Sequence, residues 1–168
     1  MANKIDHHPL LPPGGHYMDL PGLKALCVDR FSDASHIKRE RLYYAAEEAI
    51  QEVLIAKIPC RVWVNGSFVT EKPEPNDIDV MLLIELDVSK LLTEDQRIIV
   101  DKFANQSYSS VVDSSAYTAF PSGHHLCGTG CDFREYADVY GEEHSKQWRK
   151  GYAVLRLGET HVGLRLYR

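Results

Sequence analysis

Two aspartates with one residue between them, Asp77 and Asp79, follow a Gly66-Ser67 pair after a short spacer, residues 68–76. Side chains on a β-strand alternate between faces, so both carboxylates are predicted to point the same way. Adjacent carboxylates repel one another unless a cation lies between them, and their hard oxygen atoms suit Mg²⁺ or Mn²⁺. A glycine followed by serine at a strand end lets a phosphate approach backbone N–H groups and a hydroxyl. The spacing therefore predicts a metal site beside a phosphate site.

The elements that must position these residues follow from hydrophobic patterning. Apolar runs predict strands over residues 60–65 and 77–86, which carry the glycine-serine pair and the two aspartates. A long helix is predicted over about 35–56, where apolar side chains recur on one face. Thr93 to Gln96 form a capping box that opens a second helix ending near Ala104. Strands that alternate with helices predict an α/β (α+β) fold, with a mixed sheet flanked by helices.

Residues 65–80, which read NGSFVTEKPEPNDIDV, resemble the signature of the DNA polymerase β-type nucleotidyltransferase superfamily. That signature places Gly-Ser after an apolar strand, then a spacer, then Asp-apolar-Asp-apolar. Residues 11–14 (LPPG), Arg41-Leu42 and residues 149–151 (RKG) also resemble a family of small, functionally uncharacterised bacterial proteins of nucleotidyltransferase type. The resemblance implies a minimal nucleotidyltransferase fold that binds a nucleoside triphosphate with two divalent metals.

A third carboxylate is expected on the next strand, because two-metal phosphoryl transfer needs a ligand for the metal beside the attacking hydroxyl. Residues 108–113 are predicted to form that strand, and Asp113 at its end is the preferred ligand. Asp132 is the alternative, although it comes one element later than the order of the superfamily implies. Ser114-Ser115 replace the apolar residues that usually follow such an aspartate, so either the strand ends early or the site is weakened.

Two basic side chains are candidate phosphate ligands. Lys72 lies in the spacer, where its ammonium could reach a β- or γ-phosphate or remain solvated. Arg149 belongs to a cationic C-terminal segment, 146–168, in which six basic residues accompany one glutamate. This segment is either a solvated surface or a contact for the triphosphate. Its alternating pattern predicts a β-hairpin with strands at 152–157 and 161–167.

Length, composition and charge limit what can be expected of the domain number, the partners and the location of the protein. A chain of 168 residues with 44% hydrophobic content suits one domain over 1–168, with a proline-rich irregular segment at 1–22. The net charge of −5 argues against a general nucleic-acid coat protein. No apolar run approaches the length of a membrane span, and the four cysteines are too scattered for a disulfide framework. A cytoplasmic protein with reduced thiols is expected, and the Gly-rich residues 121–131 are predicted to form a loop, because their Cys and His spacing suits zinc poorly.

These residues predict a nucleotidyltransferase that moves a nucleotidyl group from a nucleoside triphosphate to an acceptor hydroxyl. Asp77, Asp79 and Asp113 would bind Mg²⁺ or Mn²⁺. Few residues follow Asp113, which leaves little room for a separate domain that grips a long nucleic acid, so a protein or small-molecule acceptor is favoured. The alternative is a catalytically inactive module of the same fold that binds a nucleotide or docks a partner protein.

Overall fold

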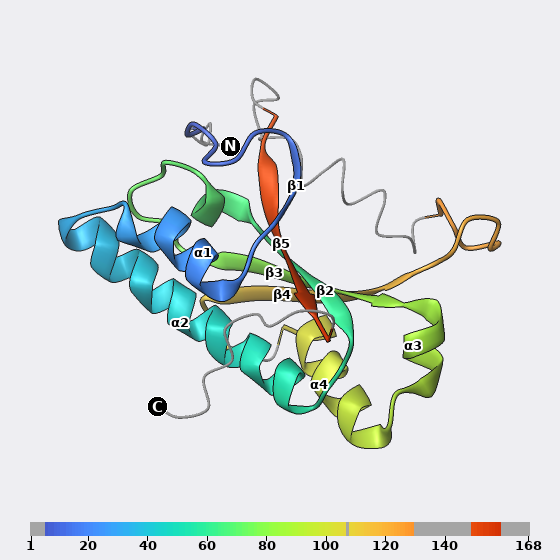
Figure 1. Cartoon of the computed structure of the whole chain (residues 1–168). Coiled ribbons are helices and arrows are strands. Elements are labelled where there is room, and N and C mark those ends of the chain that lie inside the picture. The colour runs from blue at the N-terminus through green and yellow to red at the C-terminus, as the bar shows by residue number, and fades with distance from the viewer. Residues whose placement is uncertain (1–5, 107, 130–148, 159–168) are drawn as a thin grey trace.

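The computed structural model describes residues 6–106, 108–129 and 149–158, and its strands form one five-stranded sheet (Figure 1). The strands are β1 (Gly14–Tyr17), β2 (Cys60–Asn65), β3 (Ile78–Glu85), β4 (Val112–Ala119) and β5 (Gly151–Leu157). Their order across the sheet is β1-β5-β2-β3-β4. Strand β2 is antiparallel to β3 and β5, whereas β1 with β5 and β3 with β4 are parallel pairs. The predicted class, a mixed sheet flanked by helices, is confirmed.

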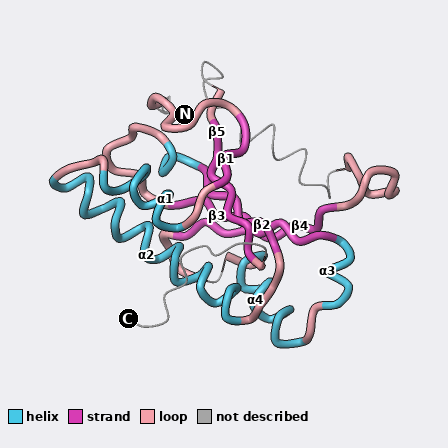
Figure 2. The backbone as a smooth tube through the Cα atoms, viewed as in Figure 1, coloured by secondary structure: helices cyan, strands magenta, loops and turns pink. Residues whose placement is uncertain are grey.

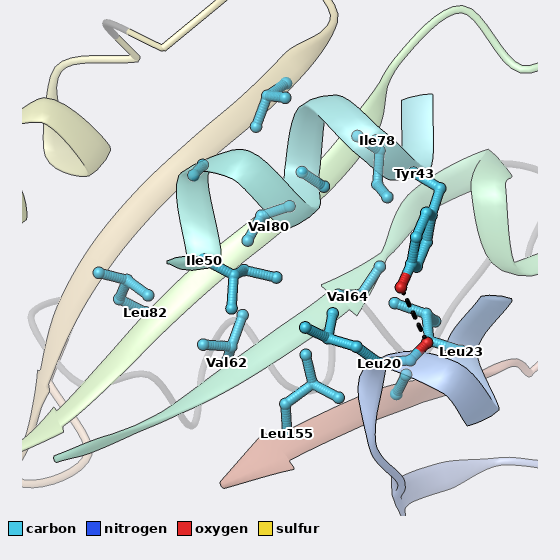
Figure 3. Close-up of a cluster of buried hydrophobic side chains, with 14 of the residues drawn as sticks. Leu20, Leu23, Tyr43, Ile50, Val62, Val64, Ile78, Val80, Leu82 and Leu155 are labelled. Carbon is cyan, nitrogen blue, oxygen red and sulfur yellow. Dashed lines mark hydrogen bonds between the residues drawn. The ribbon is translucent and has the colours of Figure 1, made fainter. Parts of the chain in front are cut away.

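The helices are α1 (Leu20–Lys24), α2 (Asp33–Ile55), α3 (Leu86–Leu91) and α4 (Glu94–Ala104), with a π-helical turn at Ala25–Asp29 after α1. The main core lies between helices and one face of the sheet, where Ile50 of α2 packs with Val62 and Leu82 (Figure 3). In the same cluster the Tyr43 hydroxyl donates to the Leu20 carbonyl at 3.1 Å. Since one face of the sheet is filled in this way, the opposite face presents Asp79 and its neighbours.

Several predicted elements agree with the structure (Figure 2). Strand β2 has its predicted bounds, and β3 differs from its prediction by one residue at each end. The capping box of α4 is present: Thr93 Oγ1 accepts from the Gln96 amide at 3.3 Å, and Gln96 Oε1 accepts from the Thr93 amide at 3.0 Å. Helix α3 was not expected from the sequence. In the described part of the chain no helix has both the length and the apolar character needed to cross a bilayer.

The prediction of an irregular segment over 1–22 is wrong for Gly14–Tyr17 and for the start of α1. Strand β1 is an edge strand that pairs in parallel with β5, and Pro9 forms an isolated bridge with Thr70. An edge strand needs partners on one side only, so nearby prolines do not prevent it. Its partner lies more than a hundred residues away, and no local pattern indicates such a pairing.

Strand β4 begins later and runs further than predicted, since it extends from Val112 to Ala119 rather than over 108–113. Of the two alternatives drawn from Ser114-Ser115, an early strand end is therefore wrong. Ser114 is buried, and its hydroxyl donates to the Phe103 carbonyl near the end of α4 at 3.0 Å. A buried hydroxyl that is hydrogen-bonded in this way is tolerated inside a strand. Strand β4 therefore carries Asp113 at its second residue.

The predicted C-terminal hairpin is described only in its first strand. Strand β5, Gly151–Leu157, begins one residue before the predicted 152–157, and it lies between β1 and β2 in the sheet. The second predicted strand, 161–167, lies outside the described residues.

Gly151, the first residue of β5, is predicted to be irreplaceable for stability. A Cβ added there would lie 2.1 Å from the Pro12 carbonyl oxygen and 2.9 Å from Leu11 Cβ. The Pro12 carbonyl cannot move aside without distorting the backbone. Gly151→Ala should therefore destabilise the fold by about 2–3 kcal/mol, the upper range for overpacking. Urea denaturation monitored by circular dichroism measures the change. Gly22→Ala is the control, because its Cβ would meet only side-chain atoms, the nearest at 3.0 Å. Equal midpoints for both variants would contradict the prediction.

Candidate functional site

The register of the sheet brings polar side chains together at one end of β2, β3 and β4. Asn65 at the end of β2 pairs with Asp79 near the start of β3, and Asp79 pairs with Asp113 near the start of β4. Residues paired across strands point to the same face, and adjacent strands lie about 4.8 Å apart. Asp79 is thus flanked by an amide and a second carboxylate, with Asp77 one residue before β3.

Gly66 and Asp79 are in direct contact. Gly66 has a φ of +73°, in the left-handed region, and begins a 3-10 turn over Gly66–Val69 immediately after β2. A Cβ added to Gly66 would lie 1.6 Å from Asp79 Oδ2 and 2.6 Å from Asp79 Cγ. The carboxylate therefore occupies the space that any other residue at position 66 would fill. The structure therefore brings Gly66 next to Asp79, while the binding of metal or phosphate there stays a prediction.

The turn that carries Ser67 continues as a well-bonded segment to Lys72. The Thr70 hydroxyl donates to the Ser67 carbonyl at 2.8 Å, and the Lys72 amide lies 3.3 Å from Thr70 Oγ1. Ser67 and Lys72 are both partly exposed. The backbone of the predicted phosphate-binding turn is consequently held in place while these two side chains remain accessible.

Arg149 and Lys150 enter the sheet at the same end as the carboxylates. Strand β5 is antiparallel to β2, and Val64 pairs with Ala153, so the residues just before β5 lie beside the end of β2. Arg149 is exposed, whereas Lys150 is 7% exposed. The topology therefore places Arg149 near the end of the sheet that carries the carboxylates; its predicted phosphate contact stays a prediction.

Asp113 is exposed, and its carboxylate accepts a hydrogen bond from Gln106 Nε2 at 3.0 Å. Gln106, which follows α4 and has a φ of +54°, was not anticipated as a contact of the site. Asp113 stands in register with Asp79, but one of its carboxylate oxygens already accepts this hydrogen bond. The alternative ligand, Asp132, lies outside the described residues.

The donor set suits a divalent cation that arrives with a phosphate ligand. No group of three or more His, Cys, Asp or Glu side chains among the described residues is arranged to hold a metal alone. Mg²⁺, however, is usually held by one or two carboxylates together with substrate phosphates and water. Asp77 and Asp79 fit that role by residue type, and the Asp79 carboxylate lies directly against the Gly66 backbone.

Arg39 is the functional candidate that sequence reasoning missed. It is fully buried and donates to backbone carbonyls of Phe68, Thr70 and Lys72 in the turn described above. A sequence signal existed, because Arg39 precedes Leu42 and Tyr43 by three and four residues and so falls on the apolar stripe of α2. A charged residue at a stripe position indicates a buried contact.

Two other features do not form part of this site. An open pocket at the opposite end of the sheet is lined in part by Cys60, Arg61 and Glu85, and Arg61 Nη2 lies 2.5 Å from Glu85 Oε1. This pocket offers no carboxylate pair. In the predicted loop, His124 stacks on Phe120 at 4.8 Å between ring centroids; Cys131, one of the residues considered for zinc, lies outside the described residues.

Comparison with known proteins gives a family and no activity. No curated protein and no solved structure matches the chain significantly. Residues 3–156 match a family described as a family of unknown function (DUF6932), and this match spans most of the 168 residues. The description carries no link to nucleotidyltransferases, so that resemblance remains a prediction from the residues themselves. The chain belongs to the family of unknown function DUF6932.

Proposed function

We propose that this protein is a metal-dependent nucleotidyltransferase that moves a nucleotidyl group from a nucleoside triphosphate to an acceptor hydroxyl. The observation that carries the proposal is the contact between Gly66 and Asp79, in which a left-handed glycine leaves room for a carboxylate. An ordinary solvated strand end requires neither a glycine in the left-handed region nor a carboxylate packed against it. Asp77, just before β3, and Asp113, in register with Asp79, would add further carboxylates beside the turn at Gly66-Ser67.

Each carboxylate has a distinct role in this proposal. Asp77 and Asp79 would hold Mg²⁺ or Mn²⁺ at the triphosphate, and Asp113 would bind the metal beside the acceptor. When bound, the metals neutralise phosphate charge and lower the pKa of the acceptor hydroxyl. The acceptor oxygen bonds to the α-phosphorus as the bond to the bridging oxygen breaks, pyrophosphate leaves, and the hydroxyl proton passes to solvent.

The turn and the basic residues act on the phosphates. Backbone N–H groups at Gly66 and Ser67, with the Ser67 hydroxyl, orient the β- and γ-phosphates, while Lys72 and Arg149 offset charge on the departing pyrophosphate. The acceptor class is a protein or small-molecule hydroxyl rather than a long nucleic acid. A cytoplasmic location is part of the proposal, supported by free thiols at Cys27 and Cys60, whose burial raises the pKa of each to about 12.

A second candidate function is a catalytically inactive module that binds a nucleotide or docks a partner. The bond from Gln106 to Asp113 favours it, because an engaged carboxylate is less available to a second metal. The absence of a preformed three-ligand group among the residues described points the same way. The two functions differ in one measurable respect, which is turnover.

Divalent metal and triphosphate are expected to stabilise the protein together. Metal relieves the repulsion between carboxylates, and phosphate completes the coordination of the metal. Ligand at about 100 times its dissociation constant adds about 2.7 kcal/mol, or roughly 5–10 °C in a chain of this size. Thermal melts with Mn²⁺ and each of the four ribonucleoside triphosphates measure the shift. Asp87→Asn is the matched control, since its side chain on α3 is 96% exposed and should retain the shift.

Turnover is tested by incubating the protein with each α-³²P-labelled ribonucleoside triphosphate and Mg²⁺ or Mn²⁺, with and without cell lysate. Label transferred to a protein or small molecule supports the nucleotidyltransferase. A triphosphate-dependent rise in melting temperature without transferred label supports the binding module. If no triphosphate changes the melting temperature, the proposal loses its physical basis.

A further inference from the structure

Arg39 occupies a cage of backbone carbonyl groups inside the protein. Its Nη1 donates to the carbonyls of Cys27 at 2.9 Å and Phe68 at 2.8 Å, and its Nη2 to those of Thr70 at 2.6 Å and Lys72 at 2.5 Å. The side chain is 0% exposed. Four carbonyls from two segments far apart in sequence therefore converge on one guanidinium.

No acidic side chain neutralises this guanidinium within the described part of the protein, where no ion pair of Arg39 is found. The Phe31 ring stacks on it instead, with the Arg39 Cζ 3.7 Å from the ring centroid. Burial lowers the pKa of Arg39 to about 10, which means that desolvation penalises the charged form. A buried charge without a counter-ion is costly unless its hydrogen bonds are met; here backbone carbonyls accept from both Nη atoms, while the buried Nε has no hydrogen-bond partner.

The carbonyls that Arg39 binds alternate along residues 68–72, from the end of the 3-10 turn into the chain that follows it. The carbonyls of Phe68, Thr70 and Lys72 all point to one side, toward α2. On the other side the Leu10 amide donates to the Val69 carbonyl at 3.0 Å, and the Glu71 amide donates to the His8 carbonyl at 2.8 Å. Hydrogen bonds to the Arg39 guanidinium on one side and to residues 8–10 on the other therefore hold this segment in place.

The segment held by these bonds, residues 68–72, directly follows Gly66-Ser67 and ends at Lys72. Gly66, Ser67 and Lys72 are the candidate phosphate ligands. We propose that Arg39 is a positioning residue for triphosphate binding, because it fixes the backbone of residues 66–72 so that Ser67 and Lys72 face the phosphates. The inference rests on the proposed binding of a triphosphate at this turn. Through this contact, the buried face of α2 would shape the turn that lies against Asp79.

Lysine cannot replace arginine in this role. An ammonium group offers a single point of charge with three donors, whereas the planar guanidinium spans four carbonyls at once. Arg39→Lys keeps the charge and loses the geometry. If Arg39 served stability alone, a folded Arg39→Lys protein would bind triphosphate with wild-type affinity when assayed well below its melting temperature.

The test compares Arg39→Lys with Arg97→Lys. Arg97 is exposed on α4 and also donates to a backbone carbonyl, that of Leu92, at 3.2 Å. Amide hydrogen exchange without nucleotide, read by mass spectrometry on peptides covering 66–72, reports the backbone directly. Isothermal titration with Mn²⁺ and each ribonucleoside triphosphate reports affinity. Arg39→Lys is expected to speed exchange in 66–72 at least tenfold and to weaken triphosphate binding at least tenfold, while Arg97→Lys changes neither.

Phe31→Leu provides a milder variant if Arg39→Lys does not fold. It removes the ring that stacks on the guanidinium and leaves Arg39 in place, so exchange in 66–72 should rise and affinity should fall severalfold. Unchanged exchange or unchanged affinity in a folded variant overturns the inference about Arg39 while leaving the triphosphate site intact. If the wild-type protein binds no triphosphate, the proposed function is wrong, and the proposed role of Arg39 in phosphate binding is wrong as well.

Discussion

Asp79→Asn is expected to abolish metal-dependent triphosphate binding, whereas Asp113→Asn should leave binding nearly intact and stop transfer. Asp79 lies against Gly66 and would hold the metal that carries the triphosphate. Asp113 pairs with Asp79 but would serve only the metal beside the acceptor. Loss of that electrostatic stabilisation should slow transfer by at least about 100-fold. Isothermal titration measures binding, and release of labelled pyrophosphate measures transfer.

The unliganded stability of these variants distinguishes a functional carboxylate from a structural one. Like charges directly opposite each other on neighbouring strands are destabilising, so Asp79→Asn should leave the metal-free protein as stable as the wild type or more stable. An unfolded Asp79→Asn protein would mean that this carboxylate is structural. Transfer that survives Asp113→Asn and fails in Asp132→Asn would make Asp132 the third ligand.

Gly66→Ala is expected to destroy the site by steric displacement. Its Cβ would fall 1.6 Å from Asp79 Oδ2, so the carboxylate must move by more than an ångström or the turn must change shape. A left-handed φ adds strain of about 1–2 kcal/mol for any residue with a Cβ. Triphosphate affinity should fall at least about 100-fold, because metal coordination does not tolerate such a displacement. Isothermal titration with Mn²⁺ and triphosphate provides the measurement.

Gly128→Ala separates the two causes. Gly128 has a φ of +77°, close to the +73° of Gly66, yet a Cβ there meets nothing within 4 Å. It should therefore show the conformational strain without the loss of binding. If Gly66→Ala binds triphosphate as tightly as Gly128→Ala does, Asp79 is not part of a triphosphate site.

Local signals in the sequence predicted the parts of the fold that depend on neighbouring residues. The capping box at Thr93, the apolar stripe of α2 and the apolar strand before Gly66 each arise from contacts within a few residues, so their pattern is readable in one stretch of chain. The same holds for the spacing of Asp77 and Asp79. Their common direction follows from the two-residue period of a strand.

Pairings between distant segments were not readable in this way. Strand β1 depends on β5, and the continuation of β4 through Ser114 depends on the Phe103 carbonyl. Each polar or proline-rich pattern is unfavourable locally and becomes acceptable only when a partner from elsewhere satisfies its hydrogen bonds. The sequence alone therefore predicted an irregular N-terminus and a short strand.

The candidate site shows the same difference between local sequence signals and contacts of distant segments. Residue type and spacing by themselves determined which side chains could hold metal and phosphate: Asp77, Asp79, Gly66 and Ser67. Only the tertiary structure decided that Asp113 stands in register with Asp79, that Gln106 binds it, and that buried Arg39 holds the turn after Gly66-Ser67 through backbone carbonyls. The physical reason is that chemistry belongs to individual side chains, whereas their alignment depends on strand register and on buried hydrogen bonds between segments remote in sequence.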